Sequence, residues 1–123
     1  MLRKILYSKI HMAMVTSVNP SYSGSLGVDR DILDAAGLRS HDAILCGNCR
    51  TGKRFETYVI PLERGCRKLE VNGAAAHLAE PGDRLIILHF AFVNEGEYAT
   101  FQPRVLLMKP DNSVEQIVRY QPD

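Results

Sequence analysis

The sequence predicts a mainly β protein, a small β-barrel with one or two short helices in a single domain of residues 1–123. A chain of this length can bury one core without disulfides or a structural metal, and no repeat or linker divides it. Short extended segments separated by turn residues dominate the chain, which is typical of small barrels. Helical segments do not alternate with these strands, so a doubly wound sheet is disfavoured.

The first third of the chain predicts a strand, a turn and a helix, in that order. Residues 9–18 are rich in methionine, valine and threonine and favour a strand. Residues 20–27 combine proline, serine and glycine, which is typical of a turn. Asp29 can cap a short helix through Ala36, and Gly37 stands where a glycine commonly ends a helix.

The rest of the chain predicts further strands separated by polar turns. Residues 84–93 are the most apolar segment and are expected to form the central buried strand. Residues 74–79 favour a helix after an Asn72-Gly73 turn, and a polar tail is expected after the last strand. The strands are expected at residues 42–46, 54–62, 68–71, 84–93 and 104–109, and polar turns at residues 48–53 and 81–83.

The charge of the chain is nearly balanced. A formal net charge of +1 argues against a nucleic-acid or anionic-membrane partner. The N-terminal segment faintly resembles a signal peptide, but Lys9 and His11 interrupt it, and no apolar run approaches membrane-spanning length. A cytoplasmic location is therefore expected.

The three cysteines leave one alternative open. Cys46 and Cys49 form a C-x-x-C pair, which is found in redox sites and in halves of zinc sites. Cys66 stands alone, and no second pair and no His-x-x-x-His completes a ligand set. No metal is predicted, and a thiol-redox or zinc module remains a competing hypothesis.

The dipeptide Gly24-Ser25 is the most informative feature of the chain because of the residues that accompany it. Taken singly, each companion has an ordinary explanation: Lys9 as a solvated strand charge, Thr57 and Tyr58 as strand formers. Asn72 with the glycine after it is a strong turn signal by itself. Only the combination of these residues, at this spacing, is specific enough to indicate a protein family.

This combination resembles the pyruvoyl-dependent aspartate 1-decarboxylases from about Met1 to Pro103. The resemblance implies a double-psi β-barrel, assembled as a homotetramer with active sites at subunit interfaces. The landmarks, in order, are Lys9-x-His11, Tyr22-x-Gly24-Ser25, Asp31-x-Leu33-Asp34-Ala35-Ala36-Gly37, Gly52-Lys53-Arg54-Phe55-x-Thr57-Tyr58, Glu63-Arg64-Gly65, Val71-Asn72-Gly73-Ala74-Ala75-Ala76-His77 and Gly82-Asp83.

The resemblance implies that the chain cuts itself between Gly24 and Ser25. The Ser25 hydroxyl would attack the Gly24 carbonyl, and elimination and hydrolysis would leave chains 1–24 and 25–123, the larger with a pyruvoyl group derived from Ser25. Glycine at position 24 is expected to supply backbone angles closed to other residues. Thr57 is implied as the donor to the oxyanion that develops on the Gly24 carbonyl.

The implied reaction is decarboxylation of L-aspartate to β-alanine, a precursor of pantothenate and coenzyme A. The substrate amine would form a Schiff base with the pyruvoyl group, which then accepts the electrons released with CO2, and Tyr58 is implied as the proton donor. The substrate's carboxylates call for cations, and Arg54 offers a planar fork suited to them. The implied substrate-binding residues are Lys9, His11, Arg54, Asn72, Gly73, Ala74 and Ala75.

The chain departs from the family pattern at one position. Family members often carry tryptophan at position 47, where this chain has Gly47 before Asn48, so a large wall residue is missing. This departure bears on substrate packing and rate more than on reaction type. The second competing hypothesis is a catalytically silent barrel that binds a ligand or partner without cleaving itself. The presence of all the implied catalytic and substrate-binding residues weighs against it.

Overall fold

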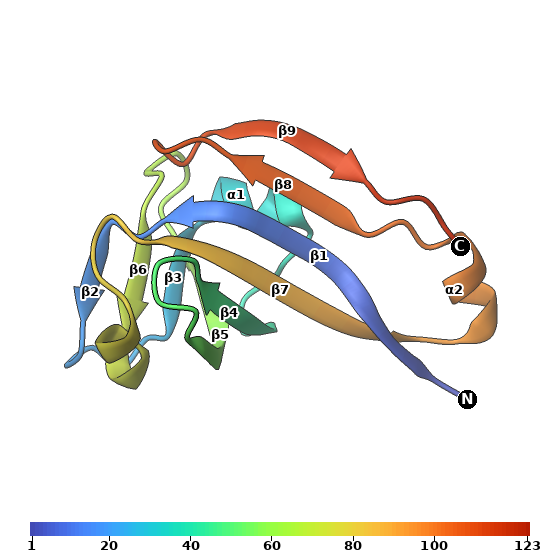
Figure 1. The fold of residues 1–123 in the computed structure, drawn as a ribbon, viewed down its shortest axis with the longest axis horizontal. Coiled ribbons are helices and arrows are strands. Elements are labelled where there is room, and N and C mark those ends of the chain that lie inside the picture. Colours follow the sequence, from blue (N-terminus) through green and yellow to red (C-terminus); the bar gives the residue numbers. More distant parts are fainter.

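The computed structural model describes residues 1–123 and is mainly β, as predicted (Figure 1). Its nine strands join one sheet, in the order β2-β6-β3-β5-β4-β7-β1-β8-β9. The elements are β1 Arg3–Met14, β2 Ser17–Asn19, β3 Leu26–Asp29, α1 Arg30–Ala36, β4 Ala43–Asn48, β5 Arg54–Leu62, β6 Leu69–Asn72, the 3-10 helix η1 Gly73–Leu78, β7 Arg84–Val93, α2 Glu95–Thr100, β8 Arg104–Met108 and β9 Val114–Arg119.

The first predicted strand is wrong in its bounds. β1 begins at Arg3, because the N-terminal residues pair with the end of β7, Arg3 opposite Val93. The chain then leaves β1 after Met14 instead of continuing as one strand. Thr16 donates its backbone N–H to the Leu69 carbonyl (2.9 Å) and so directs the chain into the separate strand β2.

Two elements in the C-terminal third were not predicted. The prediction of a polar tail after the last strand is wrong, because these residues form β9, which pairs antiparallel with β8. Helix α2 begins with a capping box, in which Asn94 and Glu97 exchange side-chain and backbone hydrogen bonds. The predicted helix at 74–79 is present, but as the 3-10 helix η1.

The core lies on the inner face of the curved sheet. Leu26 of β3, Val59 of β5, Val71 of β6 and Ile87 of β7 are all at most 1% exposed and belong to one cluster of 19 buried residues. The prediction that β7 is buried holds for one face only: Leu85, Ile87 and Val93 are buried, whereas Phe92 is 67% exposed. Both chain ends and α2 lie at the same end of the molecule (Figure 1). None of the helices has the length and apolar character needed to cross a bilayer.

The junction of β3 and α1 is fixed by one buried carboxylate. Asp29 accepts a hydrogen bond from the Asp31 N–H (2.8 Å), which confirms its predicted capping role. It also accepts from the N–H groups of Gly65 (3.0 Å) and Arg67 (2.7 Å). Gly37 ends the helix in the left-handed conformation (φ 73°), also as predicted. The short strand β3 is therefore held at its C-terminal end, which positions the residues before Leu26.

Candidate active site

Strand β3 places Gly24 and Ser25 beside β5. The two strands are parallel, with Leu26 opposite Val59 and the pairing continuing through the strand. Ser25 directly precedes Leu26 and Tyr58 directly precedes Val59, so these two residues adjoin at the start of the paired segment. Leu26 and Val59 both point into the core, so Ser25 and Tyr58 share the outer face of the barrel.

Gly24 is tightly covered, which corrects the expected reason for a glycine there. Its φ lies outside the left-handed region that favours glycine. A Cβ at this position would lie 2.6 Å from Cε2 of Tyr22 and 2.7 Å from Cδ1 of Ile60. Tyr22 and Ile60 therefore pack closely over Gly24, and any larger residue there would have to displace their side chains. Tyr22 and Ile60 were not predicted as site residues; the position of Tyr22 two residues before Gly24 was the available signal.

Asn72 adjoins Ser25 from the other side. Its backbone N–H donates to the Ser25 carbonyl (3.0 Å), because β6 runs antiparallel to β3. The side chain is buried, and its Nδ2 has no hydrogen-bond partner. Asn72 stands at the N-cap of η1 but makes no capping bond, so its amide is left free to bind a group at the site.

The backbone after Asn72 turns sharply toward Tyr22. Gly73 adopts φ 66°, a backbone conformation that residues with side chains rarely adopt. A Cβ built on Gly73 would lie 3.6 Å from the carbonyl oxygen of Tyr22. Ala74 and Ala75 follow in the same turn of η1. The structure therefore brings Gly24, Ser25, Tyr58, Asn72 and the start of η1 together.

A second group of predicted residues forms a row across four strands. His11 of β1 lies opposite Ile86 of β7, which lies opposite Gly47 of β4, which lies opposite Arg54 of β5. Residues directly opposite one another project to the same face of a sheet. Lys9, two residues before His11 along β1, shares that face, so the predicted cations all lie on the outer surface.

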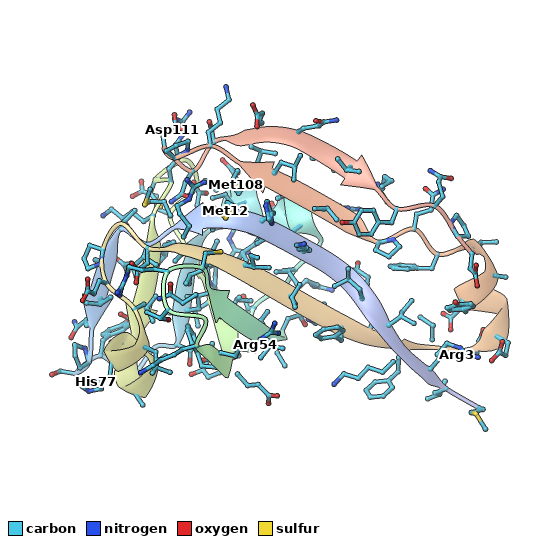
Figure 2. All side chains as sticks on the ribbon, viewed as in Figure 1. Arg3, Met12, Arg54, His77, Met108 and Asp111 are labelled. Atoms are coloured by element: carbon cyan, nitrogen blue, oxygen red, sulfur yellow. The ribbon has the colours of Figure 1, made fainter.

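Lys9 and Arg54 are both available for a ligand. Neither makes an ion pair or a side-chain hydrogen bond, whereas Arg50 is paired with Asp83 and Arg64 with Asp31. Figure 2 shows Arg54 on the β4–β5 side of the molecule, apart from Met12 on β1. Unpaired cations on one face suit the binding of carboxylates.

The surroundings of His11 favour its neutral form. Burial, followed by the nearby charges of Lys9 and Arg84, lowers the pKa of His11 below its usual value. Its Nδ1 is buried and has no hydrogen-bond partner. A neutral imidazole with a free ring nitrogen can accept or donate a hydrogen bond at the site.

Lys9 and His11 are separated from Ser25 within one chain. From β3 to β1 the sheet order counts four strand steps, so Ser25 and Lys9 are roughly 19 Å apart along the sheet. A lysine side chain does not bridge that distance. Lys9 and His11 are therefore not brought to Ser25 by their own chain.

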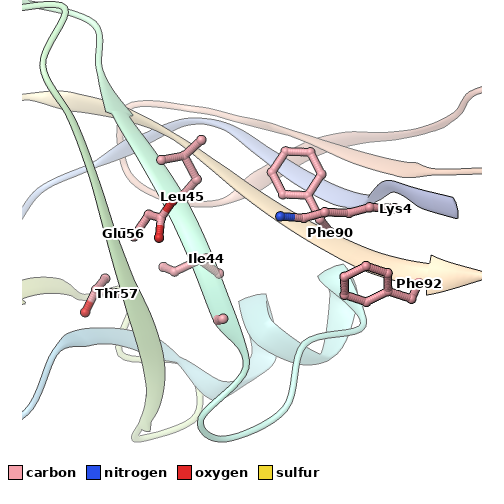
Figure 3. Close-up of a pocket in the computed structure, with 8 residues that line it drawn as sticks. Lys4, Ile44, Leu45, Glu56, Thr57, Phe90 and Phe92 are labelled. Atoms are coloured by element: carbon pink, nitrogen blue, oxygen red, sulfur yellow. The ribbon is translucent and has the colours of Figure 1, made fainter. Parts of the chain in front are cut away.

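Thr57 points away from Tyr58. Successive strand residues alternate between faces, and the exposed fractions along β5 follow this alternation. Thr57 borders a cavity of about 280 Å³ together with Lys4, Glu56 and Phe90. In Figure 3, Lys4 extends past Phe90 toward Leu45, and its Nζ lies 5.4 Å from the centre of the Phe90 ring.

A buried polar network, not predicted from the sequence, anchors the turn between β4 and β5. The carboxylate of Asp83 accepts from Arg50 Nε (2.6 Å), Arg50 Nη2 (3.0 Å) and Asn48 Nδ2 (2.8 Å). It also accepts from the Glu80 N–H (2.9 Å). Gly47 and Arg54 flank this turn, so the network helps to position these two residues at the β5 end of the row.

The cysteines occupy unlike environments. Cys46 is buried, and burial raises the pKa of its thiol to about 12. Cys49 is exposed, with Sγ 3.5 Å from Met12 Sδ. No three His, Cys, Asp or Glu side chains gather where they could hold a metal ion. A buried thiol with so high a pKa is a poor redox partner, so the geometry gives the C-x-x-C hypothesis no support.

Comparison with known proteins extends the resemblance beyond Pro103. Residues 1–115 match the model of the family described as Aspartate decarboxylase. The chain is 43% identical over 117 residues to the aspartate 1-decarboxylase of Fervidobacterium nodosum, covering 95% of this chain and 99% of that protein. It is 46% identical over 113 residues to the protein of that name from Thermosipho melanesiensis, covering 92% and 93%. The Bacillus pumilus protein of that name is 41% identical over 122 residues, covering 99% and 96%.

Proposed function

The chain belongs to the aspartate decarboxylase family, and from this premise we propose that it converts L-aspartate to β-alanine and CO2 after cutting itself between Gly24 and Ser25. The observation that carries the proposal is the convergence of Ser25, Tyr58 and Asn72 from three strands. The β-alanine would enter pantothenate and coenzyme A biosynthesis. Three unpaired cysteines suit a reducing compartment, and we place the enzyme in the cytoplasm.

Self-cleavage begins with the Ser25 hydroxyl attacking the Gly24 carbonyl. Close packing of Tyr22 and Ile60 around Gly24 restricts the bend and holds the carbonyl near the attacking oxygen. The family resemblance implies Thr57, the residue before Tyr58 on β5, as the donor to the developing oxyanion. The products are chains 1–24 and 25–123.

The residues around Ser25 fit a pyruvoyl group derived from that serine. The buried, unpartnered Nδ2 of Asn72 supplies a hydrogen-bond donor beside it. The pyruvoyl group supplies an electron sink for the charge left when CO2 departs. Tyr58, on the same face as Ser25, delivers a proton to the substrate's α-carbon from its hydroxyl.

Substrate carboxylates are held by the unpaired cations. Arg54 presents its guanidinium fork to one carboxylate, and Lys9 presents a point charge. The neutral His11 adds a hydrogen bond from its free ring nitrogen. The first residues of η1, Gly73, Ala74 and Ala75, line the substrate site next to Ser25.

We further propose that each site is completed by a second copy of the chain. Within one chain Lys9 lies four strand steps from Ser25, too far to share a small substrate. The outer face that carries the row also has the exposed side chain of Phe92 and the partly exposed side chains of Leu88 and Leu45. Such a face is suited to burial between copies. The number of four copies rests on the family resemblance alone.

A product assay with a matched control tests the proposed function. The purified protein is expected to release CO2 and β-alanine from L-aspartate in equal amounts, measured by gas analysis and chromatography. Ser25→Ala is expected to abolish both, while Ser23→Ala, two residues earlier on the same turn, leaves them intact. Absence of β-alanine from the unmodified protein would favour the catalytically silent barrel.

Subunit complementation tests the shared site. Lys9→Gln and Ser25→Ala chains are each expected to be inactive when expressed alone. Co-expressed, they should regain part of the activity, because some interfaces then combine an intact Lys9 with an intact Ser25. Ser25→Ala with Tyr58→Phe is the control, since both defects lie in the same half of the site. Equal lack of recovery in both mixtures would place the whole site in one chain.

A further inference from the structure

Gly47 is a glycine that neither backbone nor packing requires. It lies inside strand β4, where glycine is unfavourable because it packs no side chain. Its φ is not in the left-handed region, and a Cβ built on it meets no atom within 4 Å. By contrast, a Cβ at Gly24 or Gly27 would press on neighbouring side chains, at 2.6 and 3.0 Å. What glycine supplies at position 47 is empty space.

That space adjoins the guanidinium proposed to bind the substrate. Gly47 lies directly opposite Arg54 on β5 and opposite Ile86 on β7. Arg54 is exposed and makes no ion pair or hydrogen bond within the chain. On the β4 side, no side chain at position 47 limits where its guanidinium lies. Arg54 can therefore meet a carboxylate at more than one distance from the reacting carbon.

We propose, on the basis of the decarboxylase function above, that Gly47 relaxes selectivity for diacid length, so that the enzyme also decarboxylates L-glutamate. Glutamate carries the same α-amino acid group and places its second carboxylate one methylene further away. The bond from the α-carbon to its carboxylate breaks, CO2 leaves, and a proton takes its place to give 4-aminobutyrate. The reaction needs no oxidant or reductant.

The expected discrimination follows from the cost of one methylene. A pocket fitted to one length separates homologues by about 10- to 200-fold in kcat/KM. With the wall at position 47 missing, glutamate is expected to react within about tenfold of aspartate, the lower end of that range. A larger side chain at position 47 should restore the discrimination between aspartate and glutamate.

The first experiment compares kcat/KM for the two amino acids in variants of the processed enzyme. Gly47→Leu and Gly47→Trp are expected to raise the aspartate-to-glutamate ratio by about tenfold or more. Ala99→Leu, which adds exposed bulk on α2 away from the site, should leave the ratio unchanged. Failure of the unmodified enzyme to use glutamate, or an unchanged ratio in both Gly47 variants, would overturn the proposal.

A binding experiment separates this proposal from the decarboxylase function itself. Calorimetry with succinate and glutarate on the uncleaved Ser25→Ala chain measures diacid binding without any chemistry. Adding Gly47→Leu is expected to weaken the binding of glutarate by at least about tenfold more than the binding of succinate. Equal weakening of both diacids would overturn the role of Gly47, even if aspartate turnover is confirmed.

Assembly decides whether the space is filled by a neighbouring copy instead of substrate. Size-exclusion chromatography of the Gly47 variants is expected to match the unmodified protein. Dissociation of the variants with an unchanged selectivity ratio would mean that a side chain of another copy occupies the space, and the proposal would fall.

Discussion

Replacing Asp83 with asparagine is expected to destabilise the protein through the loss of one buried charge. Asp83 is only 5% exposed and accepts four hydrogen bonds, from Arg50 Nε and Nη2, Asn48 Nδ2 and the Glu80 N–H. Asparagine has the same shape but no charge. It also turns one acceptor into a donor that faces other donors.

The size of the loss follows from those contacts. Hydrogen bonds to charged groups contribute about 1.5–3 kcal/mol each, and a buried donor left unpaired costs about 1–3 kcal/mol. Arg50 is half exposed and recovers part of its bonding from water. We therefore expect Asp83→Asn to lower the free energy of unfolding by about 2–3 kcal/mol at neutral pH.

The loss is expected to depend on pH in a defined direction. The hydrogen bond from Arg50, assisted by those from Asn48 and Glu80 and opposed by burial, holds the pKa of Asp83 well below its usual value. The charged form therefore stabilises the fold fully above the unfolded-state pKa of about 3.9. That contribution is lost as the pH falls through the lower folded-state pKa, so the difference from Asp83→Asn should stay constant from about pH 5 to 8 and shrink below about pH 4.

Urea unfolding at fixed protein concentration measures both effects, because assembly makes apparent stability depend on concentration. The matched control is Asp111→Asn. Asp111 is exposed and paired with Arg67 at 3.1 Å, so its loss should lower the free energy of unfolding much less than the loss of Asp83. Equal losses for the two variants, or an Asp83→Asn difference that grows below pH 4, would refute the reasoning.

Three further substitutions test the processing and the chemistry. Thr57→Val should slow self-cleavage by about 10²–10³-fold by removing one oxyanion donor, as followed on denaturing gels, and prompt cleavage would exclude that role. Tyr58→Phe should cleave normally yet lose about 10²-fold or more in kcat for aspartate, and near-normal turnover would remove it as proton donor. Gly24→Val should leave the chain uncut, because its side chain collides with Tyr22 and Ile60; rapid cleavage in that variant would show that the close packing is not needed.

Elements with strong local signals were predictable from the sequence. The strands at residues 54–62 and 84–93 match β5 and β7 in their bounds, since a turn borders each segment, after β5 and before β7. The cap at Asp29 and the end at Gly37 were also correct, because capping depends on neighbouring residues alone. The capping box of Asn94 and Glu97 is an equally local signal, although α2 was not predicted.

Features that depend on distant partners were not predictable. β9 is polar and partly exposed, and only its pairing with β8 makes it a strand. The resemblance implied Ser25, Tyr58 and Asn72 as site residues, but their shared outer face depends on the pairing of β3 with β5 and β6. The separation of Lys9 from Ser25 likewise depends on the order of strands in the sheet.

The central claim is that the active protein is cut before Ser25 and uses the group left there. Denaturing mass spectrometry of the purified, β-alanine-producing enzyme tests it most directly. We expect two chains, residues 1–24 and residues 25–123, with no α-amino group on the larger one. A single intact chain in a preparation that still makes β-alanine would contradict the account.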